Sequence, residues 1–145
     1  MNATITLLNQ IQADAHALFV KLHNYHWNVK GMYFYAIHNK TEELYDKMAE
    51  LYDATAERAI QLGGKAVLTT GQLVALTAIE EEKAESFDAR TVLASIIKDL
   101  NYLKAKFQEL AAAADAQGDS TTVALAEGEV AELEKEIWML NASVA

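Results

Sequence analysis

Apolar side chains recur at intervals of three and four along nearly the whole chain, a spacing that places them on one face of an α-helix. Strong helix formers such as Ala, Leu, Glu and Lys fill the positions between them, and no proline interrupts the pattern. Glycines and capping residues therefore have to mark the helix ends. The pattern predicts four long helices, over about residues 5–29, 34–62, 89–116 and 121–141.

The links between these helices predict how they are arranged. We expect Gly31 and the pair Gly63-Gly64 to end the first two helices, and Asp88 and Asp119 to cap the last two. The long connection after the second helix contains a short helical pattern from Thr69 to Thr77. Two short links and one long link between four helices are typical of an all-α, ferritin-like four-helix bundle with one crossover, here with a short extra helix inside it.

Composition narrows the class of protein further. The uniform chain of 145 residues is expected to form a single domain over residues 1–145. It contains no cysteine, which excludes disulfides and thiolate metal sites. The first residues lack the basic and apolar regions of a secretory signal, and no apolar run is long enough to cross a membrane, so we expect a cytoplasmic protein without a membrane partner.

Charge makes cations likelier partners than polyanions. The chain has 21 acidic and 12 basic residues, for a formal charge of −9. Duplex DNA is bound through clustered Lys and Arg that neutralise its phosphates. The chain has no such cluster, with nothing basic before Lys21 or after Lys135. We therefore expect no DNA binding near neutral pH.

The second long helix has two opposite faces. At about 100° per residue, its apolar residues fall opposite an arc of roughly 80° that holds five carboxylates. The apolar face is expected to enter the core, which leaves the acidic arc pointing outward. We call this arc the acidic stripe, and its members are Glu42, Asp46, Glu50, Asp53 and Glu57.

The acidic stripe has two interpretations. Carboxylates opposite an apolar face are what any solvated helix surface shows. Like charges at spacings of three and four also repel each other by a few tenths of a kcal/mol per pair. Only Lys47 and Arg58 lie nearby to offset that repulsion. Cation binding would offset it better.

The histidines are the second half of a candidate metal site. All four precede residue 39, with His26 on the apolar stripe of the first helix and His38 near the start of the second. A histidine on an apolar face is usually a hydrogen-bonded core group, so position alone does not make a ligand. The Glu-x-x-His pairs that build di-iron sites inside one chain are absent. The simplest remaining geometry places His26 and His38 of one copy opposite Asp53 and Glu57 of a second copy, across a twofold axis.

These residues and their flanks resemble the Dps family of mini-ferritins, the DNA-binding proteins from starved cells. The matching segments span nearly the whole chain, and the spaced His, His, Asp, Glu set with its flanks is the most specific part. The segments are His23-Asn-Tyr-His-Trp-Asn-Val-Lys-Gly31, Phe34 with His38, Asp53-Ala-Thr-Ala-Glu57-Arg58, Gln61-Leu-Gly-Gly64 and Ile137-Trp-Met-Leu-Asn-Ala142.

The resemblance implies a specific activity. Dps proteins form hollow shells of twelve subunits that bind Fe(II) at dimer interfaces, oxidise it preferentially with hydrogen peroxide and store ferric oxide, which protects against oxidative stress. Carried over by position, the ferroxidase ligands are His26 and His38 of one subunit with Asp53 and Glu57 of its mate. Glu42 matches an acidic ligand or a neighbour of the ligands. Iron is then the only cofactor expected, with no organic group.

Two departures and one alternative remain. The Lys- or Arg-bearing terminal extension with which family members usually bind DNA is absent, and Lys65-Ala66-Val67 replaces the usual proline after the Leu-Gly-Gly turn. Trp27 matches a family tryptophan near the iron centre, but an interface or core anchor explains it equally well. The alternative function is a non-enzymatic helical shell or interaction module whose acidic stripe is only solvated surface.

Overall fold

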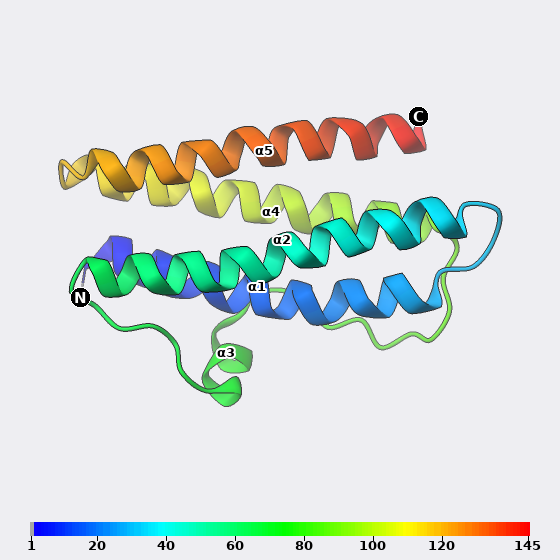
Figure 1. The fold of residues 1–145 in the computed structure, drawn as a ribbon, viewed down its shortest axis with the longest axis horizontal. Coiled ribbons are helices and arrows are strands. Elements are labelled where there is room, and N and C mark those ends of the chain that lie inside the picture. Colours follow the sequence, from blue (N-terminus) through cyan, green and yellow to red (C-terminus); the bar gives the residue numbers. More distant parts are fainter. Residues whose placement is uncertain (1) are drawn as a thin grey trace.

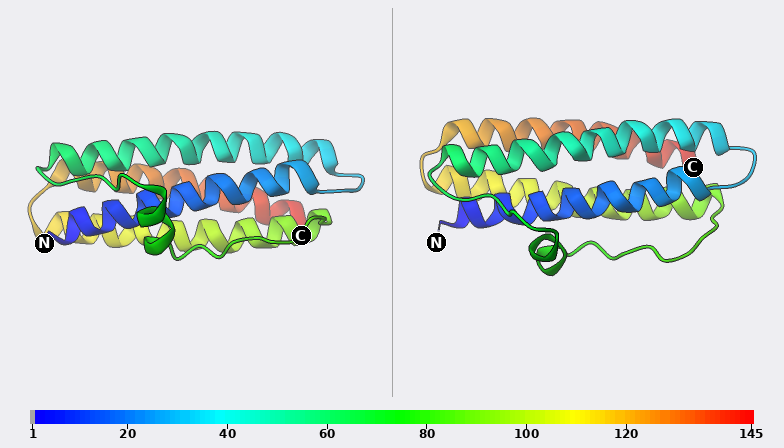
Figure 2. Two further views of the ribbon diagram at one scale, coloured as in Figure 1. Left: turned by 90° about the horizontal axis from the view of Figure 1, so that it is seen from below. Right: turned by 60° about the horizontal axis from the view of Figure 1, so that its bottom comes forward.

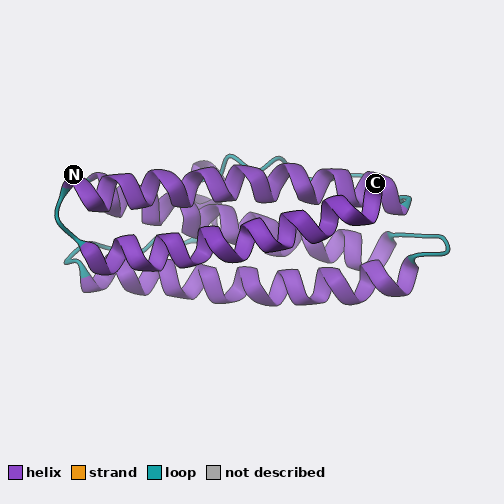
Figure 3. Cartoon of the chain, turned by 90° about the horizontal axis from the view of Figure 1, so that it is seen from above, coloured by secondary structure: helices purple, strands orange, loops and turns teal. Residues whose placement is uncertain are grey.

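The computed structural model describes residues 2–145 and contains five helices (Figure 1). Figure 3 shows helices joined by loops, and no strand occurs among the described residues. The all-α fold expected from the sequence is thus confirmed. The helices are α1 (Ala3–Asn28), α2 (Phe34–Gln61), α3 (Thr70–Leu76), α4 (Ala89–Ala116) and α5 (Ser120–Val144).

The four long helices form two antiparallel hairpins, α1 with α2 and α4 with α5 (Figure 1). The connection from Leu62 to Asp88, which we call the crossover, runs the length of the bundle and carries α3 (Figure 2). Because the crossover returns the chain to the end where α2 began, α2 and α4 run in the same direction. This is the predicted bundle with one crossover.

Side-chain caps start all of these helices except α2, where Tyr33 makes no such bond. Asp88 and Asp119 accept hydrogen bonds from the main-chain N–H groups of Thr91 and Thr122, as predicted. The start of α1 differs from the prediction, because the Asn2 side chain caps the helix and α1 therefore begins two residues before Ile5.

The other helix ends follow the local sequence. α5 continues past the predicted end at Asn141 to Val144, since no glycine or proline follows to stop it. α1 ends at Asn28, and the turn into α2 is made at Gly31, whose φ of 115° suits glycine. Gly63, with φ 86°, follows the end of α2 in the same way.

The core lies where the apolar faces of the two hairpins meet. On the apolar face of α2, Leu44, Met48, Leu51 and Ala59 are buried, as expected for that face, whereas Leu62 just after the helix is only half-buried. α4 buries an apolar stripe as well, formed by Val92, Ile96, Leu100, Leu103, Phe107 and Leu110. No helix within residues 2–145 combines the length and the apolar content needed to cross a membrane.

Candidate metal centre

His26 and His38 form a stacked pair where α1 and α2 face each other. Their ring centroids lie 3.6 Å apart, with 17° between the ring planes. His26 lies near the end of α1 and His38 in the second turn of α2, and the Gly31 turn brings these turns together. His26 is only 6% exposed, and His38 is half-buried. The structure therefore brings together the two histidines that the sequence singled out.

Hydrogen bonds fix both rings in the same way. Nδ1 of His26 donates to the His38 carbonyl at 2.7 Å, and Nδ1 of His38 donates to the His26 carbonyl at 2.8 Å. A carbonyl oxygen only accepts, so each Nδ1 carries the hydrogen and each neutral ring keeps its lone pair on Nε2. Metal-binding histidines are commonly oriented by such a bond from the second nitrogen. Each ring of the pair thus keeps one nitrogen with which it could bind a cation.

Thr41, a residue without a predicted role, also supports the ring of His26. Its hydroxyl oxygen lies 3.1 Å from Nδ1 of His26 and donates to the Ile37 carbonyl at 2.7 Å. Thr41 is fully buried, which excludes water as a competing partner. Its position three residues after His38, one turn along the same helix face, was the available signal.

Aromatic rings surround the histidine pair. Phe34 stacks on His38 at 5.1 Å between ring centroids, and Tyr45 meets His26 edge-on at 5.2 Å. Tyr45 also stacks on His23 at 3.8 Å, and His23 donates from Nδ1 to the Phe19 carbonyl at 2.7 Å. Desolvation, reinforced by the charges of Glu42 and Asp46, raises the pKa of the Tyr45 phenol. The pair therefore lies in a setting that is largely apolar but borders on negative charge.

Trp27 is more exposed to solvent than the aromatic residues that pack around the histidine pair. Its side chain is 65% exposed, and its ring centroid lies 5.4 Å from that of His23. The core-anchor interpretation of Trp27 is therefore wrong for the single chain. An exposed tryptophan beside the histidine pair remains consistent with both an interface anchor and a neighbour of the metal.

The acidic stripe points to solvent, as predicted. All five of its carboxylates belong to exposed residues. The two nearby cations form ion pairs with acids outside the stripe: Lys47 with Glu129 at 3.1 Å and Arg58 with Asp119 at 3.2 Å. Lys47 reaches the stripe only at Glu50, at 4.0 Å. Within residues 2–145, Glu42, Asp46, Asp53 and Glu57 form no ion pair, so their mutual repulsion is not neutralised.

The histidine pair and the two candidate acids lie far apart in one chain. Asp53 follows His38 by fifteen residues on the same helix, which separates them by roughly 22 Å along its axis. No group of three or more His, Cys, Asp or Glu side chains in the described part of the chain is arranged to hold a metal. Glu42, one turn after His38, is not gathered into such a group either. A single chain therefore presents two separate sets of candidate ligands, and neither set is complete.

Known proteins are similar to this chain in sequence and in fold. Residues 5–145 match the model of the ferritin-like domain. The DNA protection during starvation protein (Dps) of Helicobacter pylori is 42% identical over 142 residues, which cover 98% of this chain and 99% of that protein.

Solved structures agree with this similarity. The crystal structure of Helicobacter cinaedi CAIP superposes with a TM-score of 0.96 at 42% identity, covering 98% of this chain and 99% of that one. A Dps protein from Vibrio cholerae O1, described as one of the ferritin-like diiron-carboxylate proteins, gives a TM-score of 0.93 at 27% identity and covers 98% and 89% of the two chains. The chain thus belongs to the Dps group of the ferritin-like family.

Proposed function

We propose that this protein is an iron-storing ferroxidase whose reaction centre forms between two copies of the chain. His26 and His38 of one copy bind Fe(II), and Asp53 and Glu57 of the other copy complete the site, with Glu42 as a further carboxylate beside the histidines. The observation that carries this proposal is the reciprocal hydrogen bonding of the histidine pair, which leaves both Nε2 lone pairs free. The acids that neutralise the metal charge are exposed and unpaired, as an intermolecular site requires.

The ligand types suit iron as a substrate. Imidazole and carboxylate bind Fe(II) without the tight hold of thiolates, and carboxylate oxygens favour the harder Fe(III) product. The carboxylates of Asp53 and Glu57 alone offset the charge of one Fe(II) ion. The Vibrio cholerae relative is described as a diiron-carboxylate protein, which is consistent with iron at this site.

We further propose hydrogen peroxide as the preferred oxidant and a dodecameric shell as the store for the ferric oxide, inside the cytoplasm. Each peroxide molecule accepts one electron from each of two Fe(II) ions and takes up two protons. Its O–O bond breaks, and two water molecules leave. Consuming Fe(II) and peroxide together prevents the one-electron reaction that forms hydroxyl radicals. The name of the Helicobacter pylori relative, DNA protection during starvation protein, fits such a protective role.

Subunit complementation tests the intermolecular site. One variant carries His26→Ala and His38→Ala, and the other carries Asp53→Ala and Glu57→Ala. Each variant alone is expected to lose ferroxidase activity, because every site lacks half of its ligands. Random assembly of equal amounts gives about half mixed dimers, each with one complete site of its two, so about a quarter of the wild-type activity returns.

The measurement is Fe(II) oxidation by peroxide, followed by the absorbance of the ferric product, on particles matched in size. A mixture of each variant with itself, taken through the same reassembly, is the control. If the mixed particles stay inactive while their size is that of the wild type, the ligands do not come from two copies. Full activity of the Asp53→Ala/Glu57→Ala variant alone would favour the alternative that the acidic stripe is only solvated surface.

A further inference from the structure

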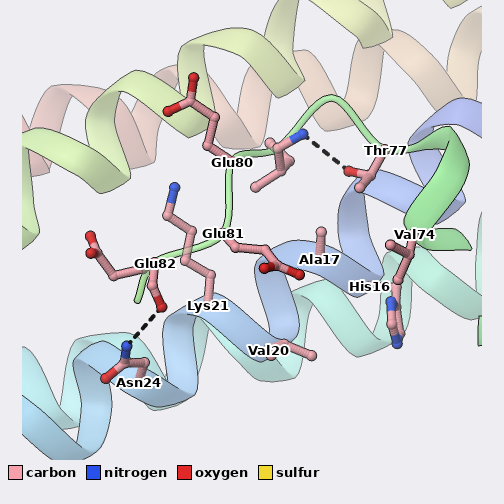
Figure 4. A pocket seen from close by; sticks show the side chains of 11 residues that line it. His16, Ala17, Val20, Lys21, Asn24, Val74, Thr77, Glu80, Glu81 and Glu82 are labelled. Atoms are coloured by element: carbon pink, nitrogen blue, oxygen red, sulfur yellow. Dashed lines mark hydrogen bonds between the residues drawn. The ribbon is translucent and has the colours of Figure 1, made fainter. Parts of the chain in front are cut away.

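The crossover is attached to the histidine-bearing end of α1 by the side chain of Asn24. The Asn24 amide nitrogen donates to the main-chain carbonyls of Glu82 at 3.2 Å and Ala84 at 3.0 Å. Figure 4 shows Asn24 and Glu82 joined in this way on the wall of a cleft between α1 and the crossover. The amide oxygen of Asn24 accepts from Nδ2 of Asn28 at 2.8 Å, so all polar atoms of this side chain are in use.

Main-chain bonds extend the attachment to the last residues of α1. The Phe87 N–H donates to the Asn28 carbonyl at 3.3 Å, and the Lys30 N–H donates to the Phe87 carbonyl at 2.8 Å. The last carbonyls of a helix have no partner inside the helix, and such ends fray unless something else binds them. The Phe87 N–H supplies that partner for the Asn28 carbonyl.

The attachment lies behind the metal-binding face. Asn24 and His26 are two residues apart on α1, which places them about 200° apart around the helix axis. His38 is oriented by the His26 carbonyl, at 2.8 Å from its Nδ1. The main chain at residue 26 therefore sets the position of both rings, and residues 82–87 bind the chain on both sides of it, at Asn24 before it and at Asn28 after it.

We propose that residues 82–87 act as a strap that positions the histidine pair, and that Asn24 is a positioning residue for the metal centre. The expected effect of the strap on metal affinity rests on the proposed function. Its expected effect on the order of the end of α1 does not depend on any metal. Loss of the Asn24 amide is expected to weaken metal binding about tenfold, at the lower end of what outer partners of metal ligands contribute.

The chain offers a matched control in Gln12. This residue also lies on α1 and also clamps the crossover with its side-chain amide, donating to the Val67 carbonyl at 2.9 Å and accepting from the Val67 N–H at 2.9 Å. Gln12 lies fourteen residues before His26, roughly 21 Å along the helix. Gln12→Ala thus removes a comparable clamp without touching the strap.

The experiment compares Asn24→Ala, Asn24→Asp and Gln12→Ala with the wild type in the assembled protein. Asn24→Asp keeps the size of the side chain but removes both donors, so it serves if Asn24→Ala fails to assemble. Two quantities are measured: the affinity for Co(II), from its visible absorption spectrum, and the amide hydrogen exchange of residues 23–30 without metal. His26→Ala defines the Co(II) signal that comes from the proposed centre.

We expect both Asn24 variants to exchange faster at residues 23–30, to bind Co(II) about tenfold more weakly and to show an altered Co(II) spectrum. Gln12→Ala should leave the affinity, the spectrum and this segment unchanged. Wild-type exchange and affinity in the Asn24 variants, or equal losses in Gln12→Ala, would overturn the strap. If His26→Ala binds Co(II) like the wild type, the proposed function has failed, and the exchange of residues 23–30 alone decides on the strap.

Discussion

The buried ion pair between α1 and α4 gives a sharp prediction about stability. Nζ of Lys21 lies 2.7 Å from a carboxylate oxygen of Asp99, and the two side chains are only 8% and 10% exposed. Lys21→Met keeps the length and the apolar contacts of the side chain but leaves the Asp99 carboxylate buried without its cation. Removing one partner of a buried pair costs about 3–5 kcal/mol, mainly through the desolvation of the charge left behind.

The double variant Lys21→Met/Asp99→Leu separates that penalty from the value of the pair itself. Replacing both charges with apolar groups of similar volume is often neutral or stabilising, so we expect it to recover most of the loss. For a chain of this length, about 2–4 °C in melting temperature corresponds to each kcal/mol, so the single variant should melt roughly 10 °C lower.

Thermal unfolding followed by circular dichroism measures both effects. All proteins must be compared at one concentration and in one state of association, because subunit contacts raise the apparent melting temperature. The reasoning would be refuted if Lys21→Met melted within about 2 °C of the wild type. It would equally be refuted if the double variant were as unstable as the single one.

Further predictions concern glycine, acid and DNA. Gly128→Ala should stabilise α5 by about 0.5–1 kcal/mol, because the added Cβ meets no atom within 4 Å. Gly64→Ala should instead lower the melting temperature, because its Cβ would lie 2.7 Å from the Ile5 side chain. Hydrogen bonds from Thr122, followed by Arg58, lower the pKa of Asp119. Its contribution to stability is therefore complete above its unfolded pKa of about 4 and is lost as the pH falls through the lower folded value. The melting temperatures of wild type and Asp119→Ala should converge as the pH falls through that range. With a charge of −9 per chain, the protein should not shift duplex DNA in a gel at neutral pH and physiological salt, and a shift would contradict the electrostatic argument.

Helix boundaries could be predicted from the sequence where local features, such as capping residues, determine them. α4 runs from Ala89 to Ala116 as predicted, because Asp88 caps one end and no competing signal interrupts the apolar stripe. α1 begins earlier than predicted although its signal was visible, since Asn2 is a favourable cap. The end of α5 carried no signal, since no glycine or proline lies between Asn141 and Val144, where the helix ends.

For the candidate site, the direction in which the side chains face could be predicted from helix periodicity, but their ion-pair partners could not. The angle around α2 predicted that Asp53 and Glu57 face outward, because that angle depends only on helix geometry. Sequence also placed Lys47 and Arg58 as the cations nearest to the stripe. In the structure Lys47 pairs instead with Glu132 on α5, and Arg58 pairs with Asp119, the N-cap of α5. Burial alone would lower the pKa of Lys47, but Glu132 and Glu129 raise it. Such choices between partners depend on the packing of helices far apart in sequence.

The order of the two hairpins along the chain matters while the protein is being synthesised. Every proposed ligand lies on the α1–α2 hairpin, which leaves the ribosome before α4 and α5 have been synthesised. A nascent hairpin of this kind folds through local contacts, but its apolar stripe, with Leu44, Met48 and Leu51, stays uncovered until the second hairpin docks. The half of the protein that carries the proposed ligands is therefore expected to emerge from the ribosome with an apolar face that chaperones can bind.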